Sequence, residues 1–329
     1  MLLSSEPAKY FHRETYPTDV PQRLRSGQGL AVGIIEIVET GILYAVIAGF
    51  FWGTSPVLVK RGLVHADVSA ATLYQQATIL VTLLAAAIIE GELFAGNMPL
   101  PAILIFAVTG FVGAYLGRTL FVITVDQIGA SRAQSLNNSS PLITVLLAAL
   151  FLREPLTLVV LIGVVLIISG VFFVTEMESK DDLPDKRKVI TLTSVMATVC
   201  YGIVPVLKKL GTDHGGTPVM GALVMHATGL LLLVTLGSLL KIEFKPERIA
   251  ASSIVCFVSA GFLYAIGSIM TLKALTYAPA SVAAPVWSAQ PIVSFFLVKS
   301  TLKGIEAVSW RDGIAAGLVV IGVVVLRWG

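Results

Sequence analysis

Residues Gly117–Glu154 read GRTLFVITVDQIGASRAQSLNNSSPLITVLLAALFLRE, and much of this stretch returns 150 residues later in the chain. The second copy starts at Gly267 and reads GSIMTLKALTYAPASVAAPVWSAQPIVSFF. The identical pairs at this offset are Gly117 and Gly267, Ala130 and Ala280, Ser131 and Ser281, Ala133 and Ala283, and Pro141 and Pro291. Two earlier segments, WGTSPVLVKRG from Trp52 and YGIVPVLKKLG from Tyr201, repeat at an offset of 149. Nearly constant offsets over most of the chain indicate an internal duplication.

The composition is typical of a membrane protein. Of the 329 residues, 56% are hydrophobic and 13% are charged, and the mean hydropathy is +0.87. Soluble domains carry about 25% charged residues, so a water-facing globule could not bury this much apolar surface. The net charge of +3 is too small to indicate nucleic acid as a partner. Cys200 and Cys256 lie within apolar runs and indicate no disulfide framework.

Ten apolar runs are long enough, at about 20 residues each, to cross a hydrocarbon core of roughly 30 Å as helices. Strands are excluded because the runs do not alternate and because an open sheet would leave unpaired edges in lipid. The predicted spans are 41–60, 70–90, 101–125, 131–151, 156–175, 189–208, 217–240, 252–275, 281–298 and 308–327.

The duplication divides these spans into two sets of five. We expect an all-α membrane protein with a first repeat at 41–175, a charged linker at 176–188 and a second repeat at 189–327. Because each copy crosses an odd number of times, the second copy must be inverted relative to the first. Inverted repeats are typical of transporters, in which two near-equivalent halves expose a central site to either side in turn. Residues 1–40 lack the apolar segment of a signal peptide and are predicted to form a polar tail.

Several motifs resemble the EamA family of the drug/metabolite transporter superfamily. Each copy opens with the pattern W/Y-G…P-V-L-x-K, at Trp52–Lys60 and Tyr201–Lys209, and each has a proline in its fourth span. The first copy closes with LFLREPLT…GVVLIISG at Leu150–Gly170, and the second closes with a degenerate version at Glu306–Gly322. The resemblance covers residues 40–327 and implies ten membrane spans. It also implies that the substrates are small metabolites, such as amino acids, sugars or nucleotide precursors, or drugs.

Two signals disagree over the orientation in the bilayer. The resemblance implies cytoplasmic termini, and the positive-inside rule should then place Lys and Arg in the loops after the even-numbered spans. Those loops carry Arg153, Lys208 and Lys209. The opposite loops carry Lys60, Arg61, Lys180, Lys186, Arg187, Lys188, Lys241, Lys245, Lys299, Lys303 and Arg311. We keep the expectation of cytoplasmic termini, which protease accessibility of a C-terminal tag in sealed vesicles tests.

Arg118 is the first predicted site residue, because it lies well inside the third span. A cation at mid-membrane costs about 3 kcal/mol or more and persists where it faces a cavity or a partner. It could anchor an anionic or carboxylate group of a substrate, or it could pair with Asp126 or a helix-end carbonyl. Its repeat counterpart is Ser268, and this asymmetry favours substrate contact. Asp126 is also the candidate for coupling transport to protons.

Further polar and aromatic residues are predicted to line a substrate site. Asn137 and Asn138 stand just before Pro141, which removes a backbone donor and frees a carbonyl nearby. These amides could contact substrate or could hydrogen-bond between helices. The counterparts of Asn137 and Ser140 are Trp287 and Gln290, which are included in the site. The aromatic residues with a predicted role in lining the cavity are Trp52, Tyr115, Tyr201 and Tyr264.

Matched prolines predict where the helices bend. Pro56 and Pro205 form one symmetric pair, Pro141 and Pro291 form another, and all four are predicted hinges for alternating access. We expect Glu154 and Glu306 to cap the N-termini of the helices that follow them. His226 is expected to be a hydrogen-bonded core residue. Glycines that suit close helix contact or packing in a homodimer are Gly163, Gly170, Gly317 and Gly322.

The sequence therefore favours a multi-pass carrier of small polar metabolites or drugs in the cell membrane, without cofactor or metal. An intramembrane enzyme is the weaker alternative, because no GxSxG, HExxH, paired-aspartate or Cys/His metal pattern is present. A non-transporting scaffold or receptor is the other alternative, but it would leave the matched prolines and Arg118 without a purpose.

Overall fold

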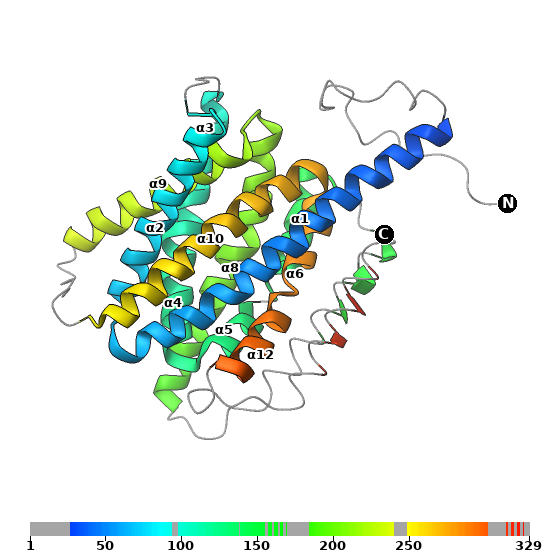
Figure 1. The fold of residues 1–329 in the computed structure, drawn as a ribbon. Helices are drawn as coiled ribbons and strands as arrows, with labels where there is room; N and C mark the ends of the chain where they lie inside the picture. Colours follow the sequence, from blue (N-terminus) through cyan, green and yellow to red (C-terminus); the bar gives the residue numbers. More distant parts are fainter. Residues whose placement is uncertain are drawn as a thin grey trace.

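The computed structural model is a bundle of helices, in which α1 (Gly27–Gly62) and α10 (Ala251–Tyr277) lie side by side (Figure 1). It describes residues 27–93, 98–137, 139–154, 184–239 and 249–301, with scattered positions between 157 and 169 and between 314 and 325. Within these residues all regular secondary structure is helical. Several predictions fall outside the described residues, among them those for Asn138, Glu306 and Gly170.

The first repeat contains α1 (Gly27–Gly62), the 3₁₀ turn η2 (Leu63–His65), α2 (Val68–Ile89), α3 (Leu100–Thr109), the π-helix η3 (Gly110–Gly117), α4 (Arg118–Ile128), α5 (Ala130–Asn137), α6 (Ser140–Leu147) and the π-helix η4 (Ala148–Leu152). The second repeat contains α8 (Pro184–Asp213), α9 (Pro218–Leu239), α10 (Ala251–Tyr277), α11 (Ala280–Trp287) and α12 (Gln290–Thr301).

Six helices within the described ranges are long and apolar enough to cross a membrane. They are Ile37–His65, Val68–Ile89, Leu100–Ile128, Leu192–Asp213, Pro218–Leu236 and Ala251–Tyr277. They match predicted spans one, two, three, six, seven and eight. Three bounds differ by five residues or more, because α1 begins at Gly27 and α8 runs from Pro184 to Asp213. Large apolar side chains project outward from the bundle, for example Val81 and Leu150 with exposed fractions of 67% and 74%, as lipid-facing positions require.

The predicted spans 131–151 and 281–298 are each broken in two rather than continuous. α5 ends at Asn137 and α6 begins at Ser140, while α11 ends at Trp287 and α12 begins at Gln290. Pro141 and Pro291 occupy the first turn of α6 and α12, where the missing N–H removes no helical hydrogen bond. These two prolines follow a break between two helices instead of bending one helix, and their role as hinges stays a prediction. Pro56 and Pro205 do lie inside continuous helices, α1 and α8.

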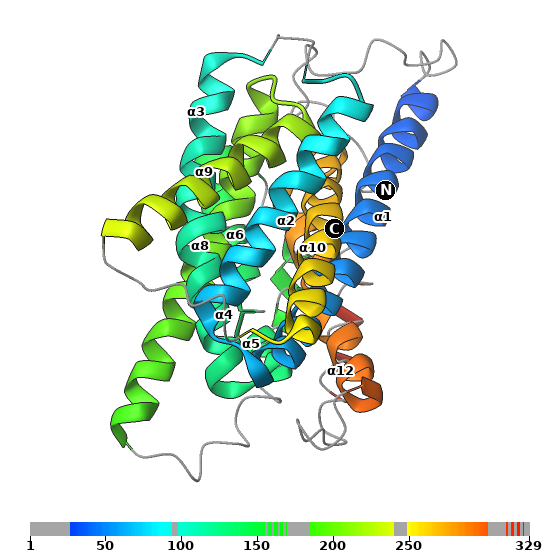
Figure 2. The same cartoon turned by 60° about the vertical axis from the view of Figure 1, so that its left-hand side comes forward.

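The two repeats run in opposite directions. A side chain at Gly41 in the first half of α1 would meet Ala278 just beyond the end of α10, and one at Gly62 at the end of α1 would meet Phe257 in the first half of α10. α1 and α10 are therefore antiparallel. At the other end of α1, Lys60 Nζ donates to the backbone carbonyl of Asp126 at 2.9 Å near the end of α4, so α1 and α4 are parallel. α10 is the repeat counterpart of η3 and α4, and it therefore runs opposite to them. Figure 2 shows the same relation between α1 and its counterpart α8.

Glycines bring the two repeats into backbone contact at matched positions. A Cβ at Gly53 in α1 would stand 2.5 Å from the carbonyl oxygen of Gln290 at the start of α12. At the counterpart Gly202 in α8, a Cβ would stand 3.0 Å from the carbonyl oxygen of Ser140 at the start of α6. The first helix of each repeat thus packs on the broken helix of the other repeat.

Matched hydrogen bonds hold these same contacts. Ser294 Oγ in α12 donates to the carbonyl of Gly53 at 2.6 Å, and its counterpart Thr144 Oγ1 in α6 donates to the carbonyl of Gly202 at 2.9 Å. Both carbonyls lie in the turn before an internal proline, where the backbone hydrogen bonding of the helix is weakened. At each of these two predicted hinges, a hydroxyl from the opposite repeat therefore supplies an additional hydrogen bond to the helix backbone.

The π-helix η3 has a cause in the sequence. Gly110 packs on the carbonyl of Met225 in α9, and Gly261 in α10 packs on the carbonyl of Gln75 in α2, so Gly110 and Gly261 are structural counterparts. Gly110 lies seven positions before Gly117, but Gly261 lies six positions before Gly267. The first repeat therefore has one extra residue here, and a π-turn is the usual way for a helix to absorb a single insertion.

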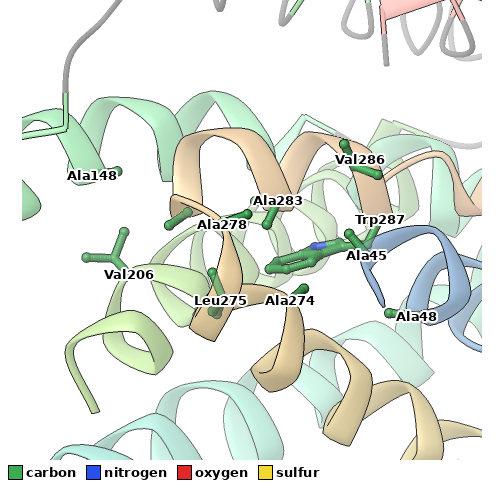
Figure 3. Packing of buried hydrophobic residues seen from close by; sticks show 12 residues of the cluster. Ala45, Ala48, Ala148, Val206, Ala274, Leu275, Ala278, Ala283, Val286 and Trp287 are labelled. Atoms are coloured by element: carbon green, nitrogen blue, oxygen red, sulfur yellow. The ribbon is translucent and has the colours of Figure 1, made fainter. Parts of the chain in front are cut away.

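The part of the bundle beside α11 is packed with small side chains. Figure 3 shows Trp287 surrounded by alanines from α1 and α10. Ala45, Ala48, Ala274 and Ala283 are fully buried there. Small residues allow helix backbones to approach closely in a membrane, where dispersion contacts rather than the hydrophobic effect drive association.

Glu154 caps a helix, although not the helix that was predicted. Its Oε1 and Oε2 atoms accept hydrogen bonds from the backbone N–H groups of Ala280 and Ser281, both at 2.9 Å. These groups begin α11 in the second repeat, so the cap joins the two repeats rather than stabilising the following helix. Glu92 makes a similar link from the first repeat, accepting from Thr217 Oγ1 at 2.6 Å and from Met220 N at 3.1 Å.

We expect Glu154→Ala to lower the melting temperature of the purified protein by a few degrees. The substitution leaves two helix-terminal N–H groups without an acceptor and removes a charge that the helix dipole favours, which together cost about 1–2 kcal/mol. Differential scanning fluorimetry in detergent measures the effect. Glu154→Gln keeps one acceptor oxygen and should fall between the wild type and the alanine variant. A melting temperature that does not change in Glu154→Ala would show that the cap contributes nothing.

Candidate functional site

A pocket lies where the breaks of the two discontinuous helices meet α1, α4, α8 and α10. Atom-free space inside it amounts to about 530 Å³, including any part that is open to solvent. The described lining residues are Trp52, Pro56, Arg118, Phe121, Asn137, Ser140, Tyr201, Val204, Pro205, Lys208, Tyr264, Trp287, Ser288 and Gln290.

Arg118 enters the pocket from the first residue of α4, immediately after the π-helix. Its side chain has an exposed fraction of 2%. One terminal guanidinium nitrogen donates to Gln75 Oε1 from α2, and Cζ lies 4.2 Å from the centre of the Tyr264 ring. Nε has no hydrogen-bond partner among the described residues. The guanidinium is therefore held in place by neutral groups and retains a free donor.

Lys208 contributes a second cation from α8. Its exposed fraction is 1%. Nζ donates to Thr271 Oγ1 at 2.9 Å and lies 5.0 Å from the centre of the Trp52 ring. Cation–π contacts of this kind stabilise a buried ammonium or guanidinium without neutralising its charge.

Two stacked aromatic rings pack against the cations, Tyr264 against Arg118 and Trp52 against Lys208. Trp52 from α1 and Tyr264 from α10 stack with ring centres 5.3 Å apart, and Trp52 also meets Trp287 edge to face at 6.1 Å. Tyr201 packs edge to face on Phe121 at 5.8 Å. The two repeats both contribute rings, so the walls of the pocket depend on how the repeats are positioned against each other.

The ends of the half-helices supply further polar groups. Asn137 closes α5 and Ser140 opens α6, while Trp287 closes α11 and Gln290 opens α12. The first N–H groups and last C=O groups of a helix lack partners within that helix. The Oδ1 atom of Asn137 also has no donor in the described part of the chain. Discontinuous helices with ends at a central site are a recurrent feature of secondary transporters.

Comparison with known proteins agrees with the two-repeat fold. The sequence model of the EamA-like transporter family matches residues 39–176 and again residues 188–328, which are the two repeats. The chain belongs to the EamA-like transporter family. It is therefore a multi-pass membrane protein of the drug/metabolite transporter type, and its family consists of transporters rather than enzymes.

A solved crystal structure supports the fold of this EamA-like protein. The two align with a TM-score of 0.69 and 18% sequence identity, over 87% of this chain and 96% of that chain. At this identity the likeness shows the fold alone. A search of curated proteins found no match.

The EamA pocket brings together most of the residues that the sequence singles out. Of the predicted substrate-binding residues, those that line it are Trp52, Arg118, Asn137, Tyr201, Tyr264, Trp287 and Gln290. The predicted hinges Pro56 and Pro205 line it as well. Their roles in binding and in motion stay predictions.

Two predicted site residues lie elsewhere, and one alternative for Arg118 is excluded. Tyr115 is half-buried and stacks on the exposed ring of Phe111, with ring centres 6.3 Å apart. The side chain of Asp126 is exposed near the end of α4, where its backbone carbonyl accepts from Lys60. Arg118 bonds to Gln75 rather than to Asp126.

Lys208 is the charged pocket residue that the sequence interpretation missed. The pair Lys208 and Lys209 predicts a loop at the end of the sixth span, but α8 continues to Asp213. The repeat carried the signal: Lys209 matches Lys60, whereas Lys208 matches Val59, which is buried. A lysine at a position that is apolar and buried in the other copy should have been placed inside the bundle.

His226 is a core residue of the EamA fold, as predicted. Nδ1 lies 3.2 Å from Gln76 Oε1 in α2, and Nε2 lies 3.2 Å from Ser268 Oγ in α10. The described residues contain no group of three or more His, Cys, Asp or Glu side chains that could hold a metal ion.

Proposed function

We propose that the protein carries small polar metabolites across the cell membrane by alternating access between two inverted repeats of five helices. The observation that carries this proposal is the polar pocket at the two helix breaks, because its walls come from both repeats. A site between two halves that pack through matched contacts can open to one side or the other as the halves rock.

The matched contacts also support a mechanism for the motion. Gly53 against Gln290 and Gly202 against Ser140 are equivalent places at which the first helix of one repeat meets the broken helix of the other. If each repeat adopted the conformation of the other, each of these two contacts would take on the geometry of the other contact. No new kind of packing would be needed. Bending at Pro56 and Pro205 would then change the width of the pocket mouth on each side.

A ligand screen followed by a flux measurement tests the proposal. The purified protein is screened by thermal shift against amino acids, sugars, nucleosides, organic anions and organic cations, because a ligand that binds the folded state raises the melting temperature. The labelled form of any compound that protects is then followed into proteoliposomes. We expect saturable entry of the unmodified compound.

The screen also separates the alternatives. Protection without flux would favour a receptor or scaffold, and recovery of a chemically altered compound would favour an enzyme. Either result would contradict the carrier proposal.

A further inference from the structure

We infer that the pocket selects a small organic oxyanion, a carboxylate or a phosphate, which binds between Arg118 of the first repeat and Lys208 of the second. This inference rests on the proposed function, because it takes this pocket to be the transport site.

The described lining of the pocket holds two buried cations, Arg118 and Lys208, and no acidic residue to balance them. The described carboxylates of Asp67, Glu90, Glu92, Asp126, Glu154 and Asp213 lie at helix ends or in the connections between helices, and Glu39 inside α1 is exposed. A buried charge without a counter-charge is costly in a membrane. A ligand that brings negative charge removes this cost from both cations at once.

The neighbours of the two cations orient them without neutralising them. Gln75 Oε1, Thr271 Oγ1 and the rings of Tyr264 and Trp52 are all uncharged. They fix the direction of each side chain and leave its charge available. This is the arrangement expected of a preorganised anion site, in which donors are held ready before the ligand arrives.

Buried hydrogen-bonding atoms without a partner indicate which further groups the ligand carries. Arg118 Nε is a buried donor without a partner in the described structure, and it can bind one oxygen of a carboxylate or phosphate. Asn137 Oδ1 is a buried acceptor in the same condition, and it requires an O–H or N–H donor. The best ligand therefore carries a hydroxyl or an amine beside its anionic group.

Neither cation is required by the duplicated fold. The counterpart of Arg118 is Ser268, and the counterpart of Lys208 is Val59, and both counterparts are buried within the same architecture without a charge. The adjacent Lys209 differs, because it donates to the carbonyl of Leu275 as its counterpart Lys60 donates to the carbonyl of Asp126. Lys209 thus has a symmetric structural role, and it provides a matched control for Lys208.

Thermal shift measurements on the purified full-length protein test the inference. The probes are succinate and its neutral isostere succinamide, glucose 6-phosphate and glucose, and the dication cadaverine, all at millimolar concentration. We expect succinate or glucose 6-phosphate to raise the melting temperature by about 5 °C. Succinamide, glucose and cadaverine should leave it unchanged. The two anionic arms distinguish a carboxylate site from a phosphate site.

Variants locate the site of protection. Arg118→Gln and Lys208→Gln should each abolish the shift caused by the anion, while Lys209→Gln should retain it. Arg118→Lys and Lys208→Arg keep the charge and should retain part of the shift, which separates loss of binding from loss of folding. An equal shift in Lys208→Gln and the wild type would place the anion elsewhere.

The inference can fail independently of the carrier proposal. Protection by succinamide, glucose or cadaverine but by neither anion would overturn it, and so would protection by none of the probes. If cadaverine or glucose protected and also entered proteoliposomes, the protein would be a carrier of another class of substrate. If succinate protected but did not enter, the anion site would stand and the carrier proposal would fall.

Discussion

Arg118→Ala is expected to reduce substrate flux by at least about 30-fold while leaving the amount of folded protein unchanged. Truncating one partner of a buried, hydrogen-bonded charge pair costs roughly 2–5 kcal/mol, and each 1.4 kcal/mol is about a tenfold loss of affinity. The side chain is buried in the pocket and its partners are neutral. A bound anion would therefore lose its strongest contact.

The physical reason predicts a pattern over three substitutions. Arg118→Lys keeps the charge but loses the planar fork of donors, so it should retain part of the flux. Arg118→Gln keeps hydrogen bonding without charge and should resemble the alanine variant. Arg61→Ala is the control, because Arg61 is an exposed cation in the last turn of α1. Counterflow in proteoliposomes measures flux, and size-exclusion chromatography measures folded protein. Normal flux in Arg118→Ala would remove this residue from the site.

Gly53→Val is the second substitution with a large expected effect. The Cβ of valine would stand 2.5 Å from the carbonyl oxygen of Gln290 and 2.8 Å from Cβ of Val293. The first of these atoms belongs to the backbone and cannot rotate away. Overpacking of this kind costs about 1–3 kcal/mol or more, and relief requires α12 to move away from α1. Because Gln290 lines the pocket, we expect loss of both thermal stability and flux.

The symmetric substitution gives the internal comparison. At Gly202 the nearest atom is Cβ of Ile143 at 2.5 Å, and the carbonyl oxygen of Ser140 is 3.0 Å away. Gly202→Val should therefore also be destabilising, through the first repeat instead of the second. Gly317→Ala is the control, since no atom of the described residues lies within 4 Å of its Cβ position. Wild-type melting temperatures and flux in both valine variants would contradict the close packing described for the two repeats.

The fold was largely predictable because duplication makes each half a check on the other. The offsets between Trp52 and Tyr201 and between Pro141 and Pro291 reveal the duplication, and the family model matches the same two repeats. They also place the discontinuous helices at matched positions in the structure. Hydropathy could not show that these helices break at Asn137 and Trp287. The two short segments on either side of each break add up to the length of one membrane span.

Site residues could be predicted where a polar residue stands in an apolar span or where the two copies differ. They could not be predicted where their position depends on the exact course of a helix. Arg118 and Gln290 could be identified because their counterparts in the other copy are residues of a different kind. Tyr115 could not be placed, since the extra residue that produces the π-helix changes which face of the helix is turned inward. Lys208 was missed because its depth depends on the point at which α8 ends, and paired lysines are also typical of a membrane boundary.

The accessibility of Ser288 from each side of the membrane tests the central claim most directly. Ser288 lines the pocket with an exposed fraction of 3%, and cysteine is close to serine in size. In a background with Cys200 and Cys256 replaced by alanine, Ser288→Cys is exposed to a membrane-impermeant anionic thiol reagent from either face of oriented vesicles. The account predicts reaction from both faces and protection by bound ligand. Reaction from one face only, with or without ligand, would show that the pocket does not alternate between the two sides.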